Sequence, residues 1–192
     1  NPELIFQHLS PRLRGDKPFV LFALRICGNC LPYVTEPLRY DREVVRTAVT
    51  ADIGDECRIF QRALKYAGPF QDDEEVVHLA IDAYGAHIVR TDSYMDSYMA
   101  GSELMPLRFA SPRLRDDFET VKRAVTLVGD SLQFASARLQ DDRDIVHAAV
   151  TADGRALRYA SRRLRKRYSI ILAALYQTGD AFKFLPEARQ AD

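Results

Sequence analysis

Cys27 and Cys30 form a Cys-x-x-Cys motif, which is the residue spacing in this chain closest to a known redox chemistry. Redox enzymes place such a pair at a helix N-terminus, where the helix dipole stabilises a thiolate. The surrounding pattern places this pair at a helix C-terminus instead, which disfavours a thiolate. A structural zinc ion needs two further ligands, and the chain has no second Cys-x-x-Cys or paired histidine motif. We therefore expect core or incidental cysteines, with a disulfide, a metal clip or a redox role as alternatives.

No other set of residues points to catalysis. The four histidines are scattered along the chain, at His8, His78, His87 and His147. The sequence lacks the Gly-x-Ser-x-Gly, phosphate-loop, dinucleotide-binding and His-Glu-x-x-His motifs. Its carboxylates recur as helix caps and not as isolated pairs. We predict that the protein is not an enzyme, and we expect no catalytic, cofactor-binding or metal-ligating residue.

A basic cluster near the C-terminal end is the strongest electrostatic feature. It consists of Arg162, Arg163, Arg165, Lys166 and Arg167. Residues 154–192 hold nine basic and three acidic side chains, a net charge of plus six, although the whole chain sums to zero. Cations where a helix begins leave backbone N–H groups open to a phosphate or carboxylate. The cluster is a candidate partner- or anion-binding site for RNA or a phosphoinositide; the alternative, which we favour, is a solvated arginine surface.

Composition excludes several other classes of protein. Hydrophobic residues make up 47% and charged residues 28% of the 192 residues, which is typical of a folded globular chain and not of a disordered one. No apolar run of about 18 residues is present to span a bilayer, and no basic-then-apolar leader opens the chain. Three cysteines fit a reducing compartment. We expect an intracellular protein, and a chain that opens on Asn1 looks excised from a longer one.

The chain consists of a repeat with a basic period of 25 residues. Units start at Asp16, Asp41, Asp73, Asp117, Asp142 and Arg167, with insertions at about residues 65–72 and 92–106. Alanine stands seven residues after every start, at Ala23, Ala48, Ala80, Ala124, Ala149 and Ala174. Glycine stands twelve or thirteen residues after every start, at Gly28, Gly54, Gly85, Gly129, Gly154 and Gly179. Such regularity predicts one structural unit repeated in tandem.

Each unit is predicted to begin with a helix of about three turns, because apolar residues recur four, seven, eight and eleven positions after the start. Acidic pairs that include Asp72, Asp116 and Asp141 are expected to cap these helices. The glycine is expected to end the helix in a left-handed conformation, and the alanine to mark a close helix crossing. Apolar residues three, six and ten positions after the glycine predict a second, shorter helix, in which Cys57 takes a core position.

Paired helices of this length cannot bury their apolar faces alone, so the units must stack. We predict an all-α fold, an α-solenoid of about six helix–turn–helix units that forms one domain over residues 1–192. The array starts midway through a unit, because Phe6 to Leu13 matches only the second half of the pattern. Phe109, Phe134 and Tyr159 share one position beside arginines and could stack on nucleic-acid bases. Packing between units explains these aromatics more simply.

The phrase Leu-Arg-Asp-Asp-x-x-x-Val-x-x-Ala-Val, followed by Gly-x-x-Leu-x-Phe-Ala-Ser, resembles the tandem repeat family called domain of unknown function 4116. Residues 107–185 match best, residues 4–64 match well, and residues 73–95 match in the first helix only. The resemblance implies a helical interaction scaffold and brings no activity, cofactor or catalytic residue. Similar repeats are common in secreted, effector-like proteins of intracellular bacteria and in protist and algal proteins. The resemblance therefore raises a host-directed bacterial protein, which would act in a host cytoplasm, as one expectation.

These observations predict a non-enzymatic helical-repeat scaffold that mediates protein–protein interaction, as a fragment of a larger protein. One alternative is an anion-directed module that binds RNA or phosphoinositide through Arg162 to Arg167. The other is a structural spacer that positions an enzyme domain outside these residues.

Overall fold

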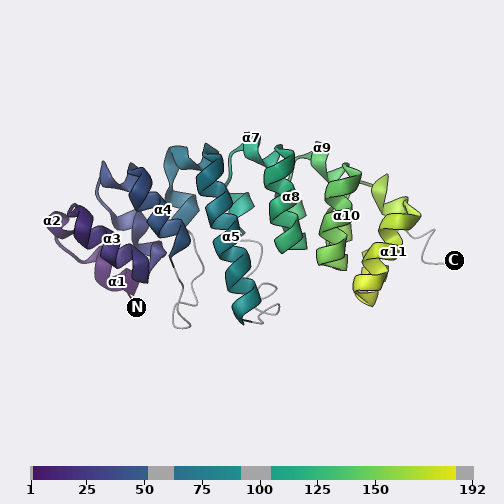
Figure 1. Ribbon diagram of the computed structural model, residues 1–192, viewed down its shortest axis with the longest axis horizontal. Helices are drawn as coiled ribbons and strands as arrows, with labels where there is room; N and C mark the ends of the chain where they lie inside the picture. Colours follow the sequence, from purple (N-terminus) through teal and green to yellow (C-terminus); the bar gives the residue numbers. More distant parts are fainter. Residues whose placement is uncertain (1, 52–62, 92–104, 185–192) are drawn as a thin grey trace. The chain divides into compact units, whose positions relative to one another are not determined.

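The structure is a computed structural model of the chain that describes residues 2–51, 63–91 and 105–184. Every regular element in these ranges is helical and none is a strand, which confirms the all-α prediction (Figure 1). The chain divides into two compact units, Asn1–Ala110 and Ser111–Asp192. Each is described by itself below. The single domain over residues 1–192 and the count of about six repeats stay predictions.

The first compact unit contains the α-helices α1 (Pro2–Gln7), α2 (Pro11–Arg14), α3 (Lys17–Ile26), α4 (Arg42–Thr50) and α5 (Glu74–Thr91). Its 3-10 helices are η1 (Gly28–Tyr33), η2 (Leu38–Tyr40), η3 (Ala63–Tyr66), η4 (Gly68–Asp72) and η6 (Pro106–Arg108). Helices α3, α4 and α5 pack against one another in chain order, and α1 packs on η1. Cys57 and most of the predicted insertion at 92–106 lie outside the described residues.

The second compact unit contains α7 (Pro112–Arg115), α8 (Phe118–Leu127), α9 (Ala137–Gln140), α10 (Arg143–Ala152) and α11 (Tyr168–Gln177). Its 3-10 helices are η7 (Gly129–Phe134), η8 (Gly154–Tyr159), η9 (Leu164–Lys166) and η10 (Gly179–Phe184). Helix α10 packs between α8 and α11, and η8 packs between η7 and η10. Long α-helices therefore form one layer, and 3-10 helices form the other.

Six long helices lie in the described ranges, and we call them the first helices. Each begins one residue after a predicted unit start. These are α3, α4, α5, α8, α10 and α11. The capping residue is the aspartate at the start itself: Asp117 Oδ2 accepts a 2.8 Å hydrogen bond from Thr120 N, and Asp142 Oδ1 accepts from Ile145 N. The expectation that Asp116 and Asp141 cap the helices was off by one residue. Arg167 stands at the corresponding position of α11 and makes no side-chain cap.

In the units that start at Asp16, Asp117, Asp142 and Arg167, the second helix is not an α-helix over its first six residues. It is a 3-10 helix that ends at an extended residue, such as Ala135 after η7 or Ala160 after η8. A single helical turn follows, and in α9 that turn is capped by the hydroxyl of Ser136. The apolar spacing of three and six positions fits a 3-10 helix, which has three residues per turn.

The recurrent glycine does not end the first helix in a left-handed conformation, which corrects that expectation. The helices end instead at an extended residue, for example Val128 after α8 and Asp153 after α10. In the parts of the chain that the structure describes, only Gly68 has a positive φ. Gly85 lies inside α5, and Gly54 lies outside the described residues.

The glycine is instead a point of contact between successive repeats. A Cβ atom added at Gly154 would lie 2.3 Å from the carbonyl oxygen of Ala174 in the next first helix. The corresponding distances are 2.1 Å from Gly28 to Ala48 O and 2.5 Å from Gly129 to Ala149 O. Any side chain at these glycines would therefore overlap a backbone carbonyl. A close crossing is therefore present at Ala48, Ala149 and Ala174, where the alanine carbonyl meets a glycine twenty residues earlier. That a larger side chain would not fit at the alanine stays a prediction.

Candidate interaction surfaces

Ion pairs along one edge of the first helices show which positions face the next helix. Lys17 Nζ of α3 lies 3.0 Å from Asp41 Oδ2 and 2.9 Å from Glu43 Oε2 at the start of α4. Lys17 stands one position after its unit start. We call the residues one, five and nine positions after a unit start the outer stripe of that first helix.

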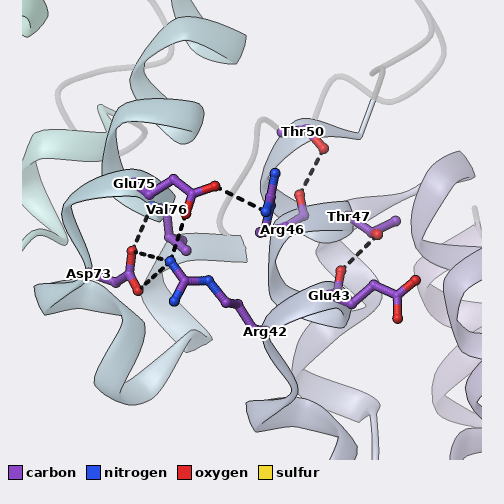
Figure 2. Close-up of polar contacts among 8 residues, drawn as sticks. All are labelled: Arg42, Glu43, Arg46, Thr47, Thr50, Asp73, Glu75 and Val76. Carbon is purple, nitrogen blue, oxygen red and sulfur yellow. Dashed lines mark hydrogen bonds and ion pairs between the residues drawn. The ribbon is translucent and has the colours of Figure 1, made fainter.

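Figure 2 shows the outer stripe of α4 against the start of α5. Arg42 lies 3.1 Å from Asp73 and 2.7 Å from Glu75, and Arg46 lies 3.0 Å from Glu75. The hollow beside these pairs has a volume of about 480 Å³ and is lined by Arg42, Glu43, Arg46, Thr47, Thr50 and Leu79.

The chemistry of this hollow is structural. Thr47 Oγ1 donates to Glu43 O, and Thr50 Oγ1 donates to Arg46 O, each at 2.8 Å. Each hydroxyl therefore donates its proton to the backbone of its own helix. The arginines are paired with acids of the neighbouring helix. The hollow therefore joins α4 to α5.

The outer stripe of α11 differs, because it is apolar and exposed. Tyr168 is 69% exposed, Leu172 is 46% exposed and Tyr176 is 97% exposed. A hollow of about 780 Å³ adjoins the stripe and is lined by Thr151, Leu172, Ala173, Leu175, Tyr176 and Gln177. The corresponding residues of α10 are Arg143, His147 and Thr151. Sequence reasoning missed this surface, although only the last unit has three apolar residues at these positions.

The predicted basic cluster surrounds η9 and the start of α11. Arg162, Lys166 and Arg167 are exposed, and Arg167 is the N-cap residue of α11. Arg165 is partly buried, and its Nε atom is buried without a hydrogen-bond partner. Arg163 is engaged within the protein: its Nε lies 3.1 Å from Asp141 Oδ1, and its Nη2 donates to Asp141 O at 2.8 Å. Among the described residues, an ion pair is found for Arg163 and for none of the other four predicted residues.

The contact between Arg163 and Asp141 recurs in the preceding repeat. We call this set of an aspartate, a serine and an arginine the latch. In the preceding repeat Ser136 Oγ donates to Asp116, and Arg138 Nε lies 3.0 Å from the same carboxylate. Ser161 donates likewise to Asp141. Hydrogen bonds from Ser136 and Arg138 lower the pKa of Asp116 below its ordinary value of 3.8, and those from Arg163 and Ser161 lower the pKa of Asp141. The sequence signal was an aspartate followed twenty and twenty-two residues later by serine and arginine.

Two of the three aromatics that could stack on bases lie in the second compact unit and are partly buried. Arg158 lies 4.6 Å from the ring centre of its neighbour Tyr159 and 2.9 Å from Asp130. Burial raises the pKa of Asp130 despite this arginine, and burial together with Asp130 raises the pKa of Tyr159. Phe134 is also partly buried. Arg158 therefore makes its closest contacts within the fold, which limits what it can offer to a base.

Cys27 and Cys30 lie where the pattern placed them, at the C-terminal end of α3 and in η1. Both thiols are buried, at 6% and 1% exposure, and no disulfide joins the two. Within 2–51, 63–91 and 105–184, no three His, Cys, Asp or Glu side chains are grouped to hold a metal ion. In the same ranges no helix combines the length and the apolarity that crossing a membrane requires.

Comparisons with known proteins agree with the repeat. A family model described as "Domain of unknown function (DUF4116)" matches residues 1–39, 19–69 and 142–188. Together these segments cover more than half of the chain. Searches of curated proteins and of solved structures returned no match. The matched segments include α3, α4, α10 and α11.

Proposed function

We propose that this chain, which belongs to the family Domain of unknown function (DUF4116), is a non-enzymatic helical-repeat scaffold that binds another protein through the outer stripe of α11. The observation that carries the proposal is the exposure of Tyr168, Leu172 and Tyr176 on successive turns of one helix. Repeat proteins commonly use the surface of their stacked helices for binding.

Physical chemistry favours a protein partner at this stripe. Contiguous exposed apolar side chains beside a hollow mark interaction sites on soluble proteins. Tyrosine is enriched at interface hot spots, because a large ring and a polar tip serve both sides of a partly wet contact. Helix α4 instead carries Arg42, Arg46 and Thr50 on its outer stripe. The partner is therefore expected to make its main contacts at α11.

Site-specific photo-crosslinking tests the proposal. A photoreactive phenylalanine analogue at Tyr176 is expected to crosslink a defined protein in extracts of the source organism. The same analogue at Tyr40, which is also exposed, is the control. Leu172→Glu should abolish capture without lowering thermal stability. Absence of a Tyr176-specific product, or the same product from both positions, would contradict the proposal.

A second function, binding of a polyanion, is favoured by the exposed side chains of Arg162, Lys166 and Arg167. The positive end of the helix dipole of α11 lies at the same place, and no side chain caps it. Retention on heparin or RNA at about 50 mM salt, lost in Arg162→Glu/Arg167→Glu, would support it. These two positions are chosen because Arg163 is bound to Asp141. No retention at low salt would remove it.

Two sequence-based expectations stay predictions. One is an intracellular location, which for a translocated bacterial effector would be the host cytoplasm. The other is a spacer role. A spacer would tolerate Leu172→Glu and Tyr176→Glu without loss of activity in the parent protein, whereas a binding scaffold would not.

A further inference from the structure

The apolar side chains of the last described repeat are less buried than the corresponding side chains of the two preceding repeats. Leu132 of η7 and Leu157 of η8 are 0% exposed, whereas the corresponding residue of η10, Phe182, is 46% exposed. Val150 of α10 is fully buried, and its counterpart Leu175 in α11 is only partly buried. We call Leu175, Gly179 and Phe182 the end face. It adjoins the outer stripe of α11, because Leu175 also lines the hollow beside that stripe.

Gly179 shows what the end face lacks. At Gly129 and Gly154 an added Cβ would meet the carbonyl oxygen of an alanine in the next first helix, at 2.5 and 2.3 Å. At Gly179 no heavy atom of the described residues lies within 4 Å of that position. The space that an alanine carbonyl occupies in both preceding repeats is open here.

We propose that the end face binds one more helix of the first-helix type, supplied from outside these 192 residues. Its chemistry follows from α10 and α11, which cover the two preceding repeats. It is an amphipathic helix of about three turns with alanine at the crossing point. Branched apolar residues flank that alanine, as Val146 and Val150 flank Ala149. The alanine carbonyl would lie over Gly179, and the apolar residues would cover Leu175 and Phe182.

A second copy of this chain does not fit as the occupant. Its first available first helix is α3, which is preceded by α1. Helix α1 packs on η1 in the manner in which η7 packs on η8, and it contributes the buried Phe6 at the position of Leu132. Docking α3 in the interior geometry would bring that α1 to the place that η10 already fills. The occupant is expected to have about ten residues, as α10 and α11 do.

An extended chain tests the proposal. A copy of residues 143–166 appended after Asp192 keeps the 25-residue spacing, because Asp192 then takes the position of Asp142. The extended chain is expected to unfold at a higher urea concentration than the original chain. Gly179→Ala should lower that midpoint in the extended chain only. Phe22→Glu, at an exposed position of the first compact unit, is the control and should leave the gain in the midpoint intact.

A fluorescence measurement reports docking directly. The chain contains no tryptophan, so Phe182→Trp provides a single reporter on the end face. Its emission should shift to shorter wavelength in the extended chain, and Gly179→Ala should reverse the shift. Unchanged emission, an unchanged urea midpoint, or an equal effect of Gly179→Ala in both chains would overturn the proposal. So would concentration-dependent dimerisation of the original chain that Phe182→Glu abolishes, because the occupant would then be a second copy.

Discussion

At the scale of single residues, the contact between successive repeats depends on an atom that is absent. Gly28, Gly129 and Gly154 have no side chain where the next helix brings a backbone carbonyl to within 2.1–2.5 Å of the would-be Cβ. Because these glycines do not have left-handed φ angles, alanine would adopt the same backbone without strain. The change in stability on replacing one of these glycines by alanine therefore reports only the steric overlap with the next helix.

Gly154→Ala is expected to lower the free energy of unfolding by about 1–3 kcal/mol, because its methyl group forces the Ala174 carbonyl and Thr178 away. Urea denaturation followed by circular dichroism checks this. Gly179→Ala is the matched control, since its methyl group meets no neighbour. Equal stability of the two variants would show that the Gly154 contact is looser than described.

The latch carboxylates predict a dependence of stability on acid. Since Arg163 and Ser161 lower the pKa of Asp141 in the folded protein, its ionised form stabilises the fold above the unfolded pKa. That contribution is lost as the pH falls below 3.8 and through the lowered folded pKa. Asp141→Asn should therefore be less stable than the parent at neutral pH and equal to it in strong acid. Parallel curves of urea midpoint against pH for the two proteins would contradict this.

The sequence predicted the place of the close contact at the alanine and predicted the glycine role incorrectly, for one physical reason. A recurrent alanine signals limited space in almost any context. A recurrent glycine has two explanations, a left-handed φ or a neighbour that excludes Cβ, and a pattern in one chain does not separate them. The partner of Gly154 lies twenty residues away at Ala174, and only the fold reveals it.

At the scale of elements, the first helices differ in how they begin. Asp16, Asp117 and Asp142 accept hydrogen bonds from the first-turn N–H groups of their helices. Arg167 does not, and its charge opposes the helix dipole. Among the first helices whose N-cap is described, α11 therefore lacks a hydrogen bond from its first-turn N–H groups to the side chain of its N-cap residue.

Arg167→Asp is expected to raise the free energy of unfolding by about 1 kcal/mol, because it restores the cap and places an anion at the positive end of α11. Thermal and urea denaturation measure the change. Asp142→Ala, which removes a working cap from α10, should lower stability by a similar amount. A destabilised Arg167→Asp protein would indicate that Arg167 has a structural contact of its own.

The second elements were predictable in position but not in type. Apolar residues at Leu132, Ala135 and Leu139 are three and four apart, which a short α-helix and a 3-10 helix accommodate equally well. Packing determines which of the two helix types forms. Helix η7 lies against η8 and against α10, and the narrower 3-10 helix brings Gly129 against α10. Local sequence does not contain that contact.

At the scale of the whole molecule, the chain comprises two compact units with a boundary between Ala110 and Ser111. Hydrogen bonds that join repeats, such as Ser136 N to Arg115 O and Ser161 N to Gln140 O, connect residues about twenty positions apart. A repeat array stabilised by nearest neighbours does not need distant parts of the chain to fold.

Residues 111–192 are therefore expected to fold alone, with a helical circular dichroism spectrum and a cooperative urea transition. A fragment of residues 130–192 lacks α8 and Gly129, so its transition should be broader and lie at lower urea. A fragment 111–192 without a cooperative transition would show that this unit depends on the rest of the chain. That result would favour the predicted single domain.

The candidate surfaces were predicted unevenly. A run of like charges is visible in any sequence, so the cluster from Arg162 to Arg167 was found, but the pairing of Arg163 with Asp141 was not. The stripe of Tyr168, Leu172 and Tyr176 was missed because apolar residues in a helix are expected to face a core. Which positions of a first helix face the next helix is shown only by contacts in the fold, such as the ion pairs of Lys17 and Arg42.

The junction between Gly154 and the Ala174 carbonyl has a consequence for how such proteins diversify. It is made of main-chain atoms and a missing methyl group, so no side chain of the outer stripe takes part in it. Residues such as Leu172 and Tyr176 can then be exchanged for others while the repeats keep their spacing. Recognition and architecture are thereby encoded by separate residues, which makes this fold a natural framework for grafting new specificities.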